Sequence, residues 1–188
     1  MQFDQTELEG AWLISPDCIE DERGFFARAW CENEFAAHGL NAQLVQCNIS
    51  YNRAAGTLRG LHWQADPHGE VKLVRCTSGV IYDVIVDVRQ QSSTFGQWRG
   101  FYLSAANRNM LYIPEGFAHG FVTLQDDTEV FYQMSALYVA DMARGLHWAD
   151  ADLGIVWPCP VSIVSDRDSA LPLFGQVFPS QARNAKVA

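Results

Sequence analysis

The sequence has no apolar stretch that approaches the length of a transmembrane helix. Its first residues, MQFDQTELEG, are acidic and lack the apolar segment of a signal peptide. The five cysteines are odd in number, and no pair has the C-x-x-C spacing, so neither a disulfide framework nor a zinc knuckle is expected. We therefore expect a cytoplasmic protein whose cysteines are buried free thiols.

Basic residues are also scarce, since 13 Lys and Arg stand against 22 Asp and Glu, for a formal net charge of −9. A general binder of nucleic acids or acidic membranes needs a basic surface, so the composition argues against both classes. A local cluster of arginines around one small phosphorylated ligand is still compatible with this charge.

Internal repeats, low-complexity tracts and long linkers are absent too, and 188 residues suffice for one domain with a sizeable core. Many short strand-like segments, separated by Gly, Asn, Asp and Pro, predict an all-β sandwich or barrel. They span residues 44–50, 56–64, 71–77, 79–88, 98–103, 109–113, 120–123 and 128–135. A helix is expected over 31–38 with Gly39 as its C-cap, a second short helix after Leu171, and a poorly ordered end from Ser180.

The segment from Val80 to Arg89 alternates between two faces of a strand. The face that begins with Val80 is entirely apolar or aromatic, and we expect it to form the core against a second sheet. The other face places Asp83 and Asp87 among apolar residues. It either lines a polar cavity or directs these carboxylates to solvent.

Two segments carry histidines in a pattern similar to that of metal-binding cupin barrels, which supply two histidines one residue apart, a glutamate and a later histidine. His62, Glu70 and His119 match three of these positions, whereas Gln64 stands at the fourth. Glutamine is a poor metal ligand compared with imidazole, so the sequence favours a cupin cavity that functions without a metal ion. A metal-dependent cupin that uses His62, Glu70 and His119 is the alternative.

Four side chains could share such a cavity. A neutral His62 imidazole is a good general base near pH 7. Lys72 opens an apolar strand, and strand patterning alone favours a side chain that snorkels to solvent. Tyr132 is either a phenol acid or a core tyrosine. Asp168, in an expected loop, either orients an imidazole or caps the following turn.

Longer motifs carry a resemblance to a known family. They are DERGFF (21–26), Q-x-N-x-S (46–50), LRGLHWQ (58–64), KLVR (72–75), DVIVDVR (83–89), S-x-TFGQW (92–98), IPEGFAHGFVTL (113–124), Tyr132, Tyr138 and I-x-WP (155–158). Together they cover nearly the whole chain, and the sequence resembles the dTDP-4-dehydrorhamnose 3,5-epimerases of the deoxysugar pathways.

The resemblance implies a homodimeric jelly-roll cupin with no metal and no organic cofactor. It implies one cupin domain over 1–188, with N-terminal strands and a dimer-exchanging segment in 1–45. The barrel core would occupy 46–140, and a C-terminal loop, short helix and tail 141–188. The substrate would be a nucleotide-diphosphate-linked 4-keto-6-deoxyhexose inverted at C3, C5 or both, in dTDP-rhamnose and O-antigen biosynthesis, with no nucleic-acid or membrane partner.

The resemblance also implies catalytic roles. His62 would remove the proton α to the ketone, with Asp168 as its orienting partner. Lys72 would stabilise the enolate oxygen, and Tyr132 would return a proton from the opposite face. Inversion needs two different residues for these proton transfers, and neither transfer needs a redox cofactor. His119 would support the cavity or serve as a hydrogen-bonded core histidine.

Further positions would bind the substrate. Arg23 and Arg59 would hold the diphosphate, and Tyr138 would supply an aromatic contact. The remaining members of this set are Phe26, Arg28, Gln46, Asn48 and His119. A non-catalytic sugar-binding module is a third possible class, but the complete set of His62, Lys72, Tyr132 and Asp168 argues against it.

Two features of the sequence complicate this reading. Arg28 stands where the thymidine-linked family is expected to have a glutamate near the base, so a CDP-linked substrate is an alternative, as is an arginine that contacts no ligand. Arg59 and His62 are an odd number of residues apart, which puts them on opposite faces of a regular strand. Either the strand bulges at Gly60, or an arginine acts from the neighbouring subunit.

Overall fold

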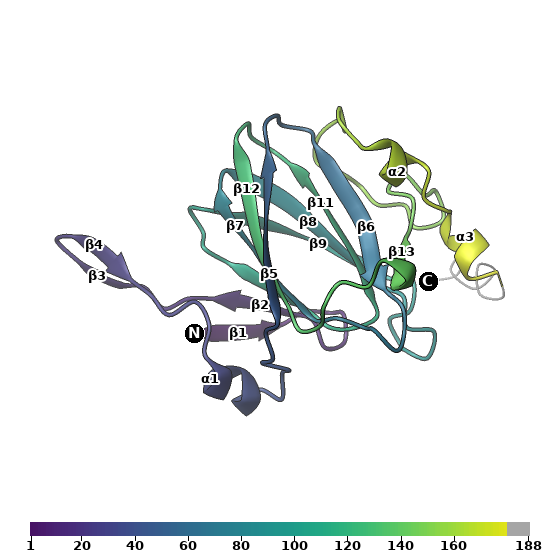
Figure 1. The fold of residues 1–188 in the computed structure, drawn as a ribbon. Helices are drawn as coiled ribbons and strands as arrows, with labels where there is room; N and C mark the ends of the chain where they lie inside the picture. The colour runs from purple at the N-terminus through teal and green to yellow at the C-terminus, as the bar shows by residue number, and fades with distance from the viewer. Residues whose placement is uncertain (180–188) are drawn as a thin grey trace.

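The computed structural model describes residues 1–179, and two stacked antiparallel sheets form its body (Figure 1). The six-stranded sheet has the order β1 (Gln2–Gln5), β2 (Trp12–Ser15), β10 (Met110–Ile113), β7 (Lys72–Ser78), β12 (Thr128–Met134) and β5 (Gln46–Asn52). The five-stranded sheet has the order β13 (Ala143–Gly145), β6 (Leu58–Gln64), β11 (Phe117–Thr123), β8 (Val80–Asp87) and β9 (Trp98–Ser104). This is the expected all-β, cupin-like sandwich.

The remaining elements are short. A separate hairpin of β3 (Ile19–Asp21) and β4 (Gly24–Phe26) projects from the body in Figure 1. The helices are α1 (Glu32–Ala37), α2 (Asp166–Ser169) and α3 (Phe174–Val177), with a 3₁₀ turn at Ala140–Met142. None of the helices in residues 1–179 has the length and apolarity needed to cross a membrane.

Most predicted elements are confirmed. Every strand segment predicted from the sequence overlaps an observed strand, from β5 to β12. Helix α1 ends before Gly39, whose φ of +69° suits glycine, and α3 is the short helix expected after Leu171. The poorly ordered end expected from Ser180 lies outside the described residues.

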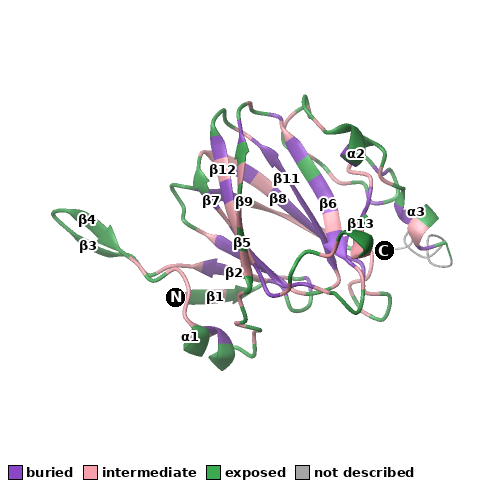
Figure 2. Cartoon of the chain, viewed as in Figure 1, coloured by how far each residue is buried: buried purple, intermediate pink, exposed green. Residues whose placement is uncertain are grey.

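The two faces of β8 pack differently from the expectation. Ile81 and Ile85 point into the sandwich, where they join residues of the six-stranded sheet such as Val74. The Val84 and Val86 face lies outside the sandwich, against a second cluster that includes Phe174. The predicted core face was therefore wrong, because the C-terminal segment covers the outer side of the sheet and both faces of β8 become buried (Figure 2).

Burial also decides between the two alternatives left open for Asp83 and Asp87, and it corrects the expectation for the cysteines. Asp83 and Asp87 are both fully buried, so neither points to solvent. Asp87 accepts hydrogen bonds from Arg89, Ser92 and Thr94, which ties down the turn that follows β8. The cysteines are free thiols as expected, but Cys76 is the single buried one among the five, all of which lie in the described residues.

Gly60 sits at a bulge in β6. In the pairing of β6 with β11, His62 lies opposite His119 and Arg59 lies opposite Phe121. Between these two pairs β6 advances by three residues and β11 by two, so β6 contains one extra residue. The φ of Gly60 is +114°, and an added Cβ would lie 2.5 Å from the Gly120 Cα and 2.6 Å from the His119 carbonyl oxygen. Only glycine fits this close approach of two backbones.

We expect Gly60→Ala to lower the free energy of unfolding by roughly 1–3 kcal/mol more than Gly39→Ala does, because overpacking adds to backbone strain. Gly39 is a matched control, since its φ is also positive but an added Cβ would meet nothing within 4 Å. Urea unfolding of both variants measures the difference. Equal losses of stability would contradict a steric role for Gly60.

Candidate active site

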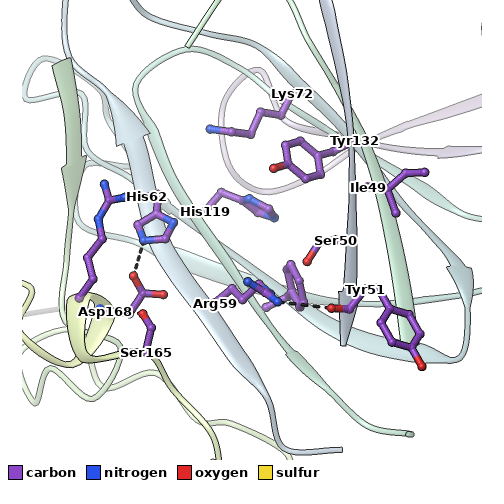
Figure 3. Close-up of a pocket in the computed structure, with 12 residues that line it drawn as sticks. Ile49, Ser50, Tyr51, Arg59, His62, Lys72, His119, Tyr132, Ser165 and Asp168 are labelled. Carbon is purple, nitrogen blue, oxygen red and sulfur yellow. Dashed lines mark hydrogen bonds and ion pairs between the residues drawn. The ribbon is translucent and has the colours of Figure 1, made fainter. Parts of the chain in front are cut away.

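A cavity of about 590 Å³ opens between the two sheets, and its lining comes from both (Figure 3). The five-stranded sheet contributes Arg59, His62 and His119, while Lys72 and Tyr132 come from the six-stranded sheet. An adjoining recess of about 290 Å³ shares His62, Lys72 and Tyr132 with this cavity. The sequence-predicted catalytic residues therefore meet in one place.

His62 and Asp168 form a hydrogen-bonded pair at one wall of the cavity. The His62 Nε2 lies 2.7 Å from Asp168 Oδ1, and the Gly60 N–H donates to Asp168 Oδ2 at 3.1 Å. The His62 side chain is 40% exposed and the Asp168 side chain 7%, so the carboxylate lies behind the imidazole. This arrangement orients the ring and leaves its face open to the cavity.

Asp168 lies in α2 and not in a loop, which corrects the expectation. Ser165 is the N-cap of this helix, and its side chain accepts a hydrogen bond from the Asp168 N–H at 3.1 Å. Burial raises the pKa of Asp168, but the His62 hydrogen bond and charge and the Gly60 N–H outweigh it, so the pKa is lowered overall. The pair thus stabilises the fold above the ordinary carboxyl pKa, and this contribution is lost as the pH falls through the lowered value.

A second histidine–carboxylate pair lies beside the first. His119 is the cross-strand neighbour of His62, and its Nε2 lies 2.8 Å from Asp83 Oδ2. Burial raises the pKa of Asp83, although the charges of His119 and Lys72 oppose this effect. His119 lines the cavity and Asp83 lies fully buried beneath it, so the polar face of β8 supports the site from below.

Lys72 does not snorkel to solvent. Its side chain is 9% exposed and forms an ion pair with Glu70, whose side chain is 5% exposed. Lys72 begins β7 on the same face as the core residue Val74, so its ammonium enters the space between the sheets. The snorkelling expectation was wrong because a buried carboxylate partners the ammonium, which strand patterning could not reveal.

Tyr132 projects from β12 toward the same space, on the side opposite His62 (Figure 3). Burial raises the pKa of its phenol, the charge of Glu70 raises it further, and Arg59 opposes both. No hydrogen bond from residues 1–179 contributes to this shift. The phenol is therefore protonated near pH 7 and available to a ligand.

Arg59 reaches the cavity from the same strand as His62. The β6 bulge at Gly60 places both side chains in the lining, which confirms the expectation for this strand. The Arg59 Nε donates to Asn52 Oδ1 at 2.7 Å. This contact holds the Arg59 guanidinium against β5, which belongs to the opposite sheet.

Gln46, Asn48 and Tyr138 line the recess next to His62 and Lys72. Gln46 Nε2 donates to Asn48 Oδ1 at 3.2 Å, and the Tyr138 N–H donates to Gln46 Oε1 at 3.3 Å. These contacts join β5 to the segment after β12. All three predicted substrate-binding residues therefore face one continuous space with His62 and Lys72.

Three predicted binding residues lie elsewhere. Arg23 and Phe26 belong to the projecting hairpin, and the Arg23 side chain is 85% exposed and paired with Asp21. Arg28 follows the hairpin, and its guanidinium pairs with Glu34 at 2.7 Å. Within a single chain, none of these three lines the cavity or its recess.

The lining also includes residues that sequence reasoning missed. They are Ile49, Ser50, Tyr51, Phe121, Ser165 and Arg167. Arg167 is the most informative, because it adds a third cation to the lining and faces both the cavity and its recess. Its position one residue before Asp168 was the available signal.

The metal hypothesis finds no ligand set here. In the described residues 1–179, no group of three or more His, Cys, Asp or Glu side chains is placed to hold a metal ion. The proposed ligands have other partners, since His62 contacts Asp168, His119 contacts Asp83 and Glu70 contacts Lys72. Gln64 instead donates to two backbone carbonyls and accepts from the Val139 N–H, which fixes the surrounding loops.

Comparisons with known proteins agree with this geometry. The dTDP-4-dehydrorhamnose 3,5-epimerase family profile matches residues 5–176. The chain is 42% identical to the dTDP-4-dehydrorhamnose 3,5-epimerase of Shigella flexneri, over 89% of this chain and 93% of that protein.

Two solved structures carry informative ligands. The Bacillus anthracis enzyme with TDP and PPi bound is 44% identical to this chain and has a TM-score of 0.89. The match covers 92% of this chain and 98% of the Bacillus anthracis chain. The Legionella pneumophila enzyme in complex with dTDP-4-keto-L-rhamnose is 35% identical, with a TM-score of 0.86 and 92% coverage of each chain.

Proposed function

Because the chain belongs to the dTDP-4-dehydrorhamnose 3,5-epimerase family, we propose that it inverts C3 and C5 of a dTDP-linked 4-keto-6-deoxyhexose. One observation carries the residue assignment: the His62–Asp168 pair faces a buried ammonium and a partly buried phenol across one cavity. This set supplies a base, an electrophile and an acid without further groups.

The reaction begins with proton removal next to the ketone. The His62 Nε2–H donates to Asp168, so Nδ1 holds the lone pair that accepts the substrate proton. Asp168 stabilises the imidazolium that forms. The electron pair of the C–H bond moves into the enolate, whose oxygen takes the negative charge.

The Lys72 ammonium stabilises the enolate oxygen. A fixed cation whose side chain is only 9% exposed does this better than water, because it needs no reorganisation as the charge develops. Tyr132 then donates its phenolic proton to the carbon from the side opposite His62, which inverts the centre. Before the same two residues invert the second carbon, the His62 imidazolium must release its proton to water and the Tyr132 phenolate must regain one, which resets the base and the acid.

Arg59 and Arg167 supply positive charge for the diphosphate, and Gln46, Asn48 and Tyr138 bind the rest of the ligand. The nucleotide we favour is dTDP, because the similar structures hold TDP and dTDP-4-keto-L-rhamnose. The pairing of Arg28 with Glu34 gives no separate support to a CDP-linked substrate.

The active enzyme in this proposal is a cytoplasmic homodimer of a dTDP-rhamnose pathway, with the dimer-exchanging segment in residues 1–45. The hairpin supports this, because it stands away from the body with Ile19 68% and Phe26 72% exposed. Insertion into a second copy would bring Arg23, Phe26 and Arg28 to that copy's cavity. Sedimentation of the intact chain against a variant with a shortened hairpin tests this point.

Solvent exchange tests the function. The protein is incubated with dTDP- and CDP-4-keto-6-deoxyglucose separately in deuterated water, and the sugar C3 and C5 protons are followed by NMR. We expect exchange at both carbons with the dTDP substrate. Exchange at one carbon alone would identify a mono-epimerase, and no exchange with either substrate would overturn the proposal.

A further inference from the structure

We infer that Glu70 is a positioning residue for the epimerisation, which holds the Lys72 ammonium in place and acts on the Tyr132 phenol through its charge. The inference rests on the proposed function and adds a residue that acts on the reaction through Lys72 and Tyr132. Glu70 was considered above as a metal ligand, but its contacts point to this different role.

Glu70 lies where it can act on both residues. Its carboxylate forms an ion pair with Lys72, and both side chains are nearly inaccessible to water. The recess next to the cavity is lined by Glu70, Lys72 and Tyr132 together. Because a lysine chain is long and flexible, this partner determines where the ammonium lies when a ketone oxygen enters.

The backbone that carries Glu70 is itself fixed. The Val71 N–H donates to Ser135 Oγ at 2.8 Å, and the Ser135 N–H donates to the Val71 carbonyl at 3.0 Å. Gln64 Nε2 donates to the His68 carbonyl at 3.1 Å, which anchors the loop before Glu70. The carboxylate therefore stands on a rigid support at the entry to β7.

Glu70 is not explained by stability alone. Its Oε2 is buried and has no hydrogen-bond partner in the described residues, so one of its oxygens is desolvated without compensation. A buried ion pair of this kind is weak grounds for a stabilising role. A residue kept at such a cost, beside the enolate-stabilising lysine, fits a role in the reaction.

The charge of Glu70 also reaches Tyr132. Burial is the larger cause of the raised Tyr132 pKa, and the Glu70 charge adds to it, so removing that charge lowers the pKa of the phenol. The other charged or ionisable side chains around the phenol are Arg59, His62, Lys72, His119, Arg167 and Asp168. Two further phenols, Tyr51 and Tyr138, line the same spaces.

The test compares Glu70→Gln, which removes the charge at constant shape, with Glu70→Asp, which keeps the charge. We expect Glu70→Gln to lower kcat by roughly 10- to 100-fold through misplacement of the ammonium, with unchanged affinity for dTDP. NMR titration of isotope-labelled tyrosine, assigned with Tyr132→Phe, should place the Tyr132 pKa lower in Glu70→Gln than in the wild type. The alkaline limb of kcat should move the same way, because the phenol must be protonated to act.

Glu70→Asp should keep the Tyr132 pKa and the alkaline limb while losing part of kcat. Glu129→Gln makes the same chemical change on β12 outside the cavity, and it should alter neither measurement. Wild-type kcat and an unmoved Tyr132 pKa in Glu70→Gln would overturn the inference, as would a parallel loss of dTDP affinity. If the wild type shows no proton exchange, the proposed function fails, whereas the tyrosine titration still decides whether Glu70 acts on Tyr132.

Discussion

Replacement of His62 by alanine is expected to slow deuterium exchange at C3 and C5 by roughly 10²- to 10⁴-fold, the usual contribution of a general base. The reason is geometric: the His62 imidazole lines the cavity, and Asp168 orients it through a hydrogen bond of 2.7 Å between Nε2 and Oδ1. Affinity for dTDP should stay unchanged, because the proposed diphosphate contacts come from Arg59 and Arg167. NMR exchange rates and calorimetric titration with dTDP measure the two quantities separately.

His68→Ala is the control for this experiment, because the His68 side chain is exposed and lies outside the cavity. It should exchange protons at the wild-type rate. Wild-type exchange in His62→Ala would remove His62 from the reaction and leave His119, on the neighbouring strand, as the next base to test. A loss of dTDP affinity equal to the loss of exchange would make His62 a binding residue.

Lys72→Met is expected to lower kcat by roughly 10²- to 10³-fold, the usual cost of losing one enolate-stabilising group. The substitution keeps the length and apolar stem of the side chain but removes the cation between the sheets. It also leaves the Glu70 carboxylate buried without its partner, which should lower the free energy of unfolding by roughly 3–5 kcal/mol. Thermal unfolding and proton exchange follow the two effects.

The double variant Lys72→Met, Glu70→Gln separates stability from catalysis. Without an unpaired buried charge, it should recover most of the lost stability, because both members of the ion pair are now neutral. Its kcat should stay as low as that of Lys72→Met. Recovery of activity along with stability would show that Lys72 serves the fold and not the enolate.

Local patterns predicted most of the fold. Alternating apolar segments between turn residues located β5 to β12, since all of these strands except the fully buried, four-residue β10 have seven or eight residues. Strand β13 and the boundaries of β1 to β4 were beyond prediction, because three or four half-exposed residues carry no clear alternation. The prediction of which face of β8 points into the sandwich failed for a different reason. The outer face is buried by a C-terminal segment that is far away in the sequence.

Site residues that belong to a sequence motif were predictable. Contacts that depend on how side chains pair in the folded chain were not. His62, Arg59 and Tyr132 stand on strands whose residues the motifs specify, and the glycine in LRG indicated the bulge. The pairing of Glu70 with Lys72 could not be predicted, because Glu70 lies two residues before β7 and strand periodicity does not extend to it. Arg167 was not predicted because its helix, α2, has only four residues, which is too short to give a periodic pattern.

The position of Asp168 links catalysis to completion of the chain. Translation produces His62, Lys72 and Tyr132 first, whereas Asp168 on α2 and the cover formed by Phe174 arrive last. A nascent chain that stops before Ser165 therefore lacks the carboxylate that orients the imidazole. Such a chain also lacks Phe174 and Phe178, which together with Leu146 and Leu153 cover the outer face of the five-stranded sheet. The pairing of His62 with its carboxylate partner therefore exists only after nearly the whole chain has been made.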